Sequence, residues 1–169
     1  MSNVDGLNRG KDFEAVIKQA FLEVPGTVVE RMPDPVQGYL GIKNKCDFYI
    51  YHFPYVYYIE CKSVNSHRLP FLNITFNQRT GMADAVENFG VVAGIMCWFI
   101  TEDKTVFLPI QTIVRRRLAG EKSINIRKLP EDEYIEISGR KKRVFFEYNM
   151  AEFLTKMQDM RFGERGINE

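Results

Sequence analysis

The pattern of hydrophobic and polar positions predicts helices and strands that alternate irregularly along the chain. Residues 11–24 place apolar side chains three and four positions apart, which is the spacing of a helix with one buried face, and Pro25 ends it. Residues 46–53 and 55–63 are rich in aromatic and β-branched residues, and the short break at Pro54 predicts a hairpin. The first part of the chain therefore predicts a helix followed by paired strands.

The rest of the chain continues this alternation and ends on a helix. The predicted elements are strands over 27–32, 91–100 and 104–110, helices over 75–90, 110–120 and 149–160, a strand–turn–strand segment over 133–148 that turns at Ser138–Gly139, and a loop over 65–74. The resulting order, α, β, β, β, α, β, β, α, β, β, α, lacks the regular repeat of a doubly wound fold. We therefore predict an α/β fold with a mixed β-sheet flanked by helices.

Composition indicates one domain and does not by itself indicate a partner. The 169 residues are 45% hydrophobic and 27% charged, which suffices for one core. We expect a domain over 11–160 between flexible segments over 1–10 and 161–169. The net charge of +1 does not indicate a nucleic-acid binder, so any basic surface must be local. We find no signal-peptide core and no apolar run long enough to span a membrane, and expect a cytoplasmic protein without a membrane partner.

The cysteines give no sign of a metal or redox site. Cys46, Cys61 and Cys97 are odd in number and lack CxxC spacing. Two of them lie in strand-like apolar runs, so we expect buried, reduced thiols.

Charged residues interrupt the most strand-prone stretch of the chain. Asp47 begins the first strand of the predicted hairpin, and Glu60 and Lys62 lie two positions apart near the end of the second. Because strand side chains alternate between faces, Glu60 and Lys62 share a face, and the hairpin brings Asp47 beside them. Two carboxylates form an oxygen-rich site for Mg²⁺ or Mn²⁺, and the lysine can face a phosphate oxygen or an attacking water. The pattern predicts metal-assisted phosphodiester hydrolysis, with a surface ion pair as the alternative.

Further segments accompany this pattern and make it more specific. They are "NRGKDFE" at 8–14, "RMPDPVQ" at 31–37, "LPFLNITFNQ" at 69–78 and "GVVAGIMCWFI" at 90–100. With the thirteen-residue spacing from Asp47 to Glu60, the chain resembles the PD-(D/E)xK nuclease superfamily. More narrowly, it resembles the RecU-type Holliday junction resolvases of Gram-positive bacteria and their phages.

The resemblance implies a restriction-endonuclease-like fold and roles for the charged residues. Asp47 and Glu60 would ligate Mg²⁺ or Mn²⁺, and the main-chain carbonyl of Cys61 would complete the metal site. Lys62 would position the nucleophile or the scissile phosphate. Two helix residues are candidates for supporting roles, with solvated helix positions as the alternative: Glu14 as an auxiliary acid, and Gln78 as a contact to water or phosphate.

The chain departs from the family pattern at two places. Tyr58 stands where the family usually has an additional Asp, two residues before the Glu, so the metal site rests on fewer carboxylates. Only nine residues separate Gln37 from Asp47, where RecU proteins insert a long stalk that enters the junction centre. We therefore expect a phage-like protein with a shortened stalk and a smaller preference for four-way junctions.

Basic residues near the predicted site are candidates for contacts to DNA phosphates. The candidates are Arg9, Lys11, Lys43, Lys45, His67, Arg68, Arg115, Arg116 and Arg117. For each of them, the alternative is an ordinary solvated position.

Together these features predict a homodimeric, Mg²⁺-dependent endonuclease that resolves four-way junctions by paired nicking, in a bacterial host or on its nucleoid. A four-way junction has two-fold symmetry, which suits a dimer with two sites related by a dyad. The alternatives are a PD-(D/E)xK nuclease for other branched or flapped DNA and a non-catalytic DNA-binding module on the same fold.

Overall fold

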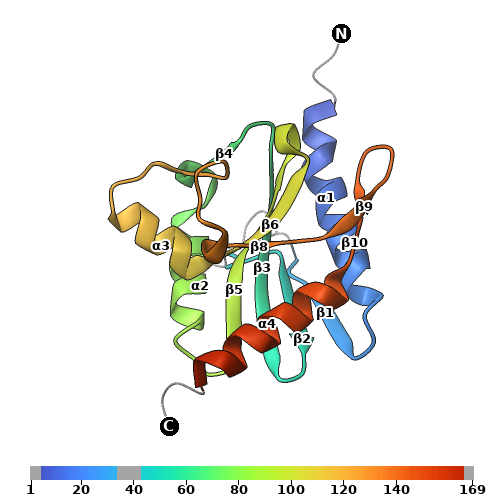
Figure 1. Cartoon of the computed structure of the whole chain (residues 1–169), viewed down its shortest axis with the longest axis vertical. Coiled ribbons are helices and arrows are strands. Elements are labelled where there is room, and N and C mark those ends of the chain that lie inside the picture. The colour runs from blue at the N-terminus through green and yellow to red at the C-terminus, as the bar shows by residue number, and fades with distance from the viewer. Residues whose placement is uncertain (1–4, 34–42, 166–169) are drawn as a thin grey trace.

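The computed structural model describes residues 5–33 and 43–165, with side chains over 9–33 and 43–160. Its centre is a six-stranded mixed sheet with the strand order β1-β2-β3-β5-β6-β8 (Figure 1). In this sheet, β3 and β5 pair in parallel, and the other neighbours pair antiparallel. The strands are β1 (Thr27–Arg31), β2 (Phe48–His52), β3 (Tyr55–Val64), β5 (Val91–Phe99), β6 (Lys104–Pro109) and β8 (Ile135–Glu136).

Helices cover both faces of this sheet. On one face, α1 (Asp5–Leu22) and α4 (Met150–Arg165) pack with Phe13 and Phe153 in one apolar core. On the other face, α2 (Phe76–Ala85) and α3 (Ile110–Leu118) contribute Met82 and Ile113 to a second core (Figure 1). The predicted α/β fold with a mixed sheet flanked by helices is therefore confirmed.

Strand alternation along β3 decides where the charged residues point. Tyr57, Ile59 and Cys61 belong to the core beneath α1 and α4. Glu60 and Lys62 alternate with them, so their side chains leave the sheet on the face that carries α2. This alternation places the predicted site on the α2 face, at the carboxyl end of β3.

The helix ends differ from their predicted positions. Helix α1 begins at Asp5 rather than at residue 11, so the predicted flexible segment over 1–10 overlaps a helix from Asp5 onward. Helix α4 continues to Arg165 and overlaps the predicted tail over 161–169 in the same way. The first helix therefore begins with mostly polar residues that precede the apolar pattern from which it is predicted.

Two small sheets stand apart from the central one. The predicted turn at Ser138–Gly139 is wrong, because Gly139 begins β9 (Gly139–Lys141), which pairs with β10 (Phe146–Tyr148). The predicted loop over 65–74 contains β4 (Arg68–Pro70), which pairs with the unpredicted β7 (Ser123–Asn125). Single-turn 3₁₀-helices complete the chain at Phe71–Asn73, Ile100–Glu102 and Glu131–Glu133. The β4–β7 pair ties the segment after β3 to the segment after α3.

Candidate active site

Asp47 lies directly before β2, and backbone hydrogen bonds on both sides fix its position. Its N–H donates to the Ile59 carbonyl at 3.1 Å, and its own carbonyl accepts from the Met32 N–H at 2.8 Å. Asp47 therefore continues the pairing of β2 with both of its neighbours, and its side chain is held at the end of the sheet where β3 presents Glu60.

The Asp47 carboxylate is fixed by a main-chain donor. Its Oδ2 accepts a hydrogen bond from the Cys61 N–H at 2.8 Å. Because the N–H and C=O of one strand residue point to the same edge of the strand, the Cys61 carbonyl also faces the Asp47 side. A cation bound by Asp47 would therefore find the predicted third oxygen donor on the correct edge of β3.

Glu60 is a buried carboxylate with one engaged oxygen and one orphaned oxygen. Its side chain is 4% exposed, and Oε1 lies 2.7 Å from the Lys62 ammonium nitrogen. The same Oε1 accepts from the Gln78 amide at 2.6 Å. Oε2 is buried and has no hydrogen-bond partner among the residues that the structure describes. A buried oxygen without a donor is costly, which indicates a position built for a further group.

The start of α2 fixes the Gln78 side chain. Thr75 Oγ1 accepts from the Gln78 N–H at 3.2 Å, and Gln78 Oε1 accepts from the Thr75 N–H at 3.0 Å. This reciprocal pair is a capping box, and it leaves the Gln78 amide nitrogen as the donor to Glu60. Gln78 therefore orients the Glu60 carboxylate. Thr75 is a site-supporting residue that the sequence analysis missed, although its Thr-x-x-Gln pattern indicates a capping box.

Burial and the repulsion between Asp47 and Glu60 favour the protonated forms of these carboxyl groups. Burial, and next the charge of Asp47, raise the pKa of Glu60 to about 7, against the opposing effect of Lys62. Burial also raises the pKa of Asp47, although the Cys61 N–H, Lys62 and Arg31 oppose it. A divalent cation between these carboxylates would offset the repulsion and favour their ionised forms.

Glu14 reaches the site from the other face of the sheet. Its carboxylate lies 3.5 Å from the Arg31 guanidinium at the end of β1. Arg31 in turn helps to lower the pKa of Asp47, and Glu14 helps to raise that of Glu60. The structure therefore brings Glu14 close to the two predicted metal ligands, as an outer member of the same charge cluster.

The donor set fits a hard cation with few protein ligands. Across residues 9–33 and 43–160, no three His, Cys, Asp or Glu side chains are grouped to hold a metal ion. Tyr58, at the position of the additional acid, packs against Tyr49 instead, with ring centroids 4.5 Å apart and the ring planes tilted by 43°. What remains is Asp47, the orphaned Glu60 oxygen and the Cys61 carbonyl, an all-oxygen set of the kind that Mg²⁺ accepts together with water.

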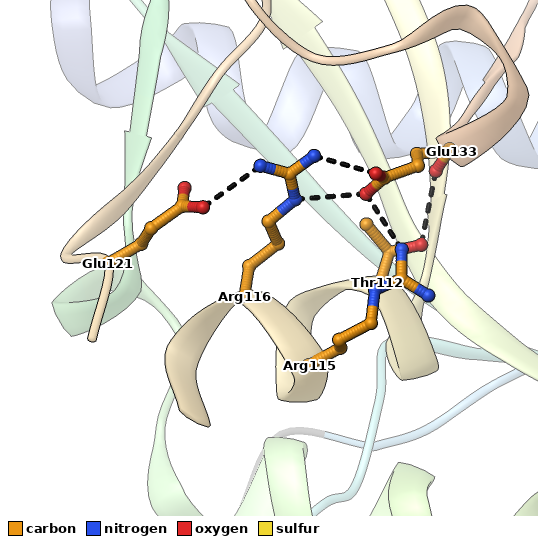
Figure 2. A network of polar contacts seen from close by, with 5 residues as sticks. All are labelled: Thr112, Arg115, Arg116, Glu121 and Glu133. Carbon is orange, nitrogen blue, oxygen red and sulfur yellow. Dashed lines mark hydrogen bonds and ion pairs between the residues drawn. The ribbon is translucent and has the colours of Figure 1, made fainter. Parts of the chain in front are cut away.

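Two of the three consecutive arginines are occupied by internal ion pairs (Figure 2). Arg115 and Arg116 lie 2.7 Å and 2.6 Å from Glu133 oxygens, and Arg116 also lies 2.9 Å from Glu121. The Thr112 hydroxyl donates to the Glu133 carbonyl at 3.1 Å and holds this segment against α3 (Figure 2). These contacts give Arg115 and Arg116 a structural role, which weakens the expectation that they bind phosphates.

The other predicted DNA contacts are spread around the site. Exposed Lys43 and Lys45 flank it, because the Asn77 amide donates to the Lys43 carbonyl at 2.7 Å and ties this segment to α2. Arg68 is exposed on β4, and His67 lies near Glu102 in the turn after β5. Arg9 and exposed Lys11 belong to the first turns of α1. The segment predicted to be a shortened stalk falls largely on residues 34–42, which lie outside the described residues.

The remaining expectations concern the cysteines and membranes. Cys46, Cys61 and Cys97 are free and buried, as predicted. Burial raises the pKa of Cys46 to about 12 and also raises those of the other two thiols. No helix within the described residues is long and apolar enough to cross a membrane.

Comparison with known proteins gives a likeness at the level of the fold. No protein-family model matches the chain, and no curated protein matches it. Among solved structures, the chain is similar to Hjc, a Holliday junction resolvase from the archaeal hyperthermophile Archaeoglobus fulgidus. The identity is 15% and the TM-score 0.47, over 76% of this chain and 88% of that chain. A likeness at this level carries no weight for function, which rests on the site geometry.

Proposed function

We propose that this protein is a metal-dependent endonuclease that hydrolyses DNA phosphodiester bonds. The observation that carries the proposal is Glu60, a buried carboxylate beside Asp47 with one oxygen fixed and one orphaned. A surface ion pair, the alternative interpretation, does not account for a carboxylate that is 4% exposed and leaves a buried oxygen unsatisfied.

Asp47, Glu60 and the Cys61 carbonyl would hold the cation, which the resemblance and the all-oxygen donor set identify as Mg²⁺ or Mn²⁺. When bound, such a cation lowers the pKa of a water molecule and offsets charge on the phosphate. The protein contributes the geometry. The Cys61 N–H fixes one Asp47 oxygen, and the Gln78 amide and the Lys62 ammonium fix one Glu60 oxygen.

Lys62 provides the positive charge next to the reacting group. Its side chain is 22% exposed, so the ammonium reaches the surface while it contacts the buried Glu60. From that position it can hold a non-bridging phosphate oxygen or orient the attacking water. Charge placed where it develops in the transition state is typically worth a few kcal/mol. Lys62 therefore supports hydrolysis directly, whereas Gln78 acts through Glu60.

For the substrate we propose branched DNA, with the four-way junction preferred, and a homodimer as the acting species. The resemblance to RecU-type resolvases supports both. Resolution of a junction requires paired nicks in two strands, and two sites related by a dyad supply them. The proposed site is complete within one chain, so the dimer would set the spacing between cuts rather than complete either centre.

A cleavage panel tests this proposal. The purified protein is incubated with Mg²⁺ and with a labelled four-way junction, flap, linear duplex or single strand, each run in parallel with a chelator. We expect Mg²⁺-dependent nicking, strongest on the junction. Asp47→Asn, Glu60→Gln and Lys62→Ala should abolish it, while the first two should bind the junction at least as tightly, because they remove negative charge. Full activity of the Glu60→Gln protein would remove this site from consideration.

A further inference from the structure

A second group of cations lies on the α2 face, outside the site described above. Arg117 near the end of α3, Lys122 beyond it and Arg68 on β4 line one groove of about 680 Å³. The groove is built by pairing between distant segments, since β4 pairs with β7 and the Phe71 N–H donates to the Lys122 carbonyl at 3.0 Å. The fold thus brings Arg68 to the same groove as Arg117 and Lys122, which come from a distant part of the sequence.

Within the described part of the chain, these cations have no carboxylate partners. Among the described residues, the Arg117 and Lys122 side chains form no ion pair or hydrogen bond, and Arg68 donates to the Ser123 hydroxyl at 3.3 Å. Glu121, the acid that lines the groove, lies 2.9 Å from Arg116 and is already engaged. Like charges without a counter-ion repel one another, so a bound anion would lower the energy of this surface.

Arg79 connects the groove to the active site. It follows Gln78, whose amide contacts Glu60, and its guanidinium lies over the Phe76 ring, 5.4 Å from the centroid. Helices α2 and α3, which carry Arg79 and Arg117, contact each other. Burial, and next the charge of Arg117, lower the pKa of Arg79. We call the four cations the basic track; its members are Arg68, Arg79, Arg117 and Lys122.

Two exposed apolar side chains accompany the basic track. Leu72, which lines the groove, is 93% exposed, and Phe76, which carries Arg79, is 71% exposed. Cations that follow a backbone, combined with apolar side chains that contact bases, are the usual elements of a surface for single nucleic-acid strands.

We infer that the basic track holds the phosphate backbone of a DNA strand that leads away from the Glu60 site. The inference rests on the proposed function, which identifies DNA as the ligand. Arg115 and Arg116 are excluded from the track although they adjoin Arg117, because both pair with Glu133 and Arg116 also pairs with Glu121. Within one run of three arginines, only the third is therefore expected to contact phosphate.

This exclusion provides a matched pair of variants. Arg117→Gln and Arg115→Gln each remove one charge from an exposed position on α3. Binding of a fluorescein-labelled four-way junction is measured by anisotropy in EDTA, where cleavage does not contribute. We expect Arg117→Gln to weaken binding roughly threefold to tenfold and to reduce the slope of log K against log salt by about 0.9, as for one lost phosphate contact. Arg115→Gln should bind like the parent protein.

Lys122→Gln serves as a second variant and should follow Arg117→Gln. The basic track is overturned if all three variants, Arg117→Gln, Lys122→Gln and Arg115→Gln, bind DNA equally well. They could all bind like the parent protein, or all bind more weakly by the same factor because each has lost one positive charge. If the parent protein still nicks DNA in Mg²⁺ in that case, the proposed function stands and the track alone fails. A parent protein that neither binds nor cleaves DNA overturns both.

Discussion

At the residue scale, Glu60 occupies a position where a carboxylate costs folding free energy. It is buried beside Asp47, and both effects raise its pKa to about 7. A hydrophobic or amide side chain at position 60 would avoid this free-energy cost. A carboxylate at an exposed position would not have it either. Sites that hold like charges together are frequently functional, because a ligand offsets the repulsion. The cost of Glu60 is therefore consistent with a cation-binding role.

The pH dependence of stability tests this cost in metal-free protein. In the folded chain Glu60 keeps its proton up to about pH 7, whereas its ordinary pKa is 4.5. Between these values the folded state binds more protons than the unfolded state, so the free energy of unfolding falls as pH rises. Since one pKa unit corresponds to about 1.4 kcal/mol, the full loss is about 3 kcal/mol. Urea denaturation in EDTA at several pH values measures it.

Glu60→Gln should lose this slope, because the amide does not titrate. Exposed Glu87→Gln, near the end of the α2 segment, is the matched control and should keep the parent profile. If the parent and Glu60→Gln curves run parallel from pH 4.5 to 7.5, Glu60 is not held in the protonated state that its burial indicates.

At the element scale, the first turn of α2 connects helix capping to the chemistry of the site. The capping box between Thr75 and Gln78 stabilises the helix start and also aims the Gln78 amide at Glu60. A helix N-terminus leaves several backbone N–H groups without intrahelical partners, and a side-chain cap satisfies one of them. One pair of hydrogen bonds thus supports both folding and the orientation of Glu60, the proposed metal ligand.

Removing this cap should separate the two effects. Thr75→Ala should cost about 1 kcal/mol of stability and should lower the cleavage rate, because Gln78 loses its fixed orientation. Thr75→Ser restores the hydroxyl and should recover both properties. Thermal unfolding and nicking of the four-way junction in Mg²⁺ are measured on the three proteins. If Thr75→Ala lost stability but cleaved at the parent rate, the cap would play no part in orienting Glu60.

The central strand β5 allows a close approach that only glycine permits. A Cβ on Gly94 would lie 2.3 Å from the Leu108 carbonyl oxygen and 2.6 Å from the Phe107 ring. Both atoms belong to the neighbouring strand β6, so relief requires a backbone shift in the centre of the sheet. Gly94→Ala should therefore destabilise the protein by about 3 kcal/mol, the upper part of the usual range for overpacking.

Gly10→Ala is the opposite case within the same chain. Gly10 lies in α1, and a Cβ there meets nothing within 4 Å. Alanine should stabilise the helix by roughly 0.5–1 kcal/mol, because glycine loses more backbone entropy on folding. Urea denaturation measures the change in the free energy of unfolding for both variants, which should be opposite in sign. A Gly94→Ala protein as stable as the parent would contradict the packing described for β5 and β6.

The local chemistry of particular residues shows what the sequence could predict. Alternation alone places Glu60 and Lys62 on one face, and the hairpin brings Asp47 to them, so the charge cluster follows from periodicity. The turn at Ser138–Gly139 is mispredicted for a physical reason. A Cβ on Gly139 would meet the Glu147 carbonyl at 2.8 Å, so this glycine serves close strand approach rather than a turn.

Longer-range pairing explains the other differences. Strands β4 and β7 have three residues each and carry no readable period, so their pairing depends on the tertiary fold. The same holds for Glu133, which forms ion pairs with Arg115 and Arg116 although it lies in a separate segment of the sequence. A run of three arginines looks uniform in sequence, but only the fold shows which of their charges have acidic partners.

At the scale of the whole molecule, the candidate site lies where several connections meet at one end of the sheet. β3 ends there, residues 43–47 enter β2 there, and α2 begins there with Gln78. Parallel pairing of β3 with β5 forces a long crossover between them, and α2 lies within that crossover. The topology thus brings a helix start to the strand that carries Glu60.

The segment before Asp47 gives the last prediction, on junction selectivity. A stalk as long as that of RecU proteins does not fit between Gln37 and Asp47, so the proposed junction selectivity would have to come from shorter contacts or from the shape of the proposed dimer. Lys43 and Lys45 are exposed beside α2, and the Lys45 stem passes over Gly81, where a Cβ would meet its Cγ at 2.5 Å. We expect a junction preference that is smaller than that of a stalked resolvase and that depends partly on these lysines.

Competition binding decides this, with a labelled four-way junction challenged by unlabelled duplex of equal length in EDTA. Lys43→Ala with Lys45→Ala should reduce the junction preference, because both lysines flank the proposed site, where the arms of a bound junction would converge. Lys18→Ala with Lys128→Ala removes the same charge elsewhere and should weaken both DNA forms equally, leaving the preference unchanged. If the Lys43→Ala and Lys45→Ala protein also keeps its junction preference, these two lysines attract all DNA equally. The preference would then come from the geometry of a dimer.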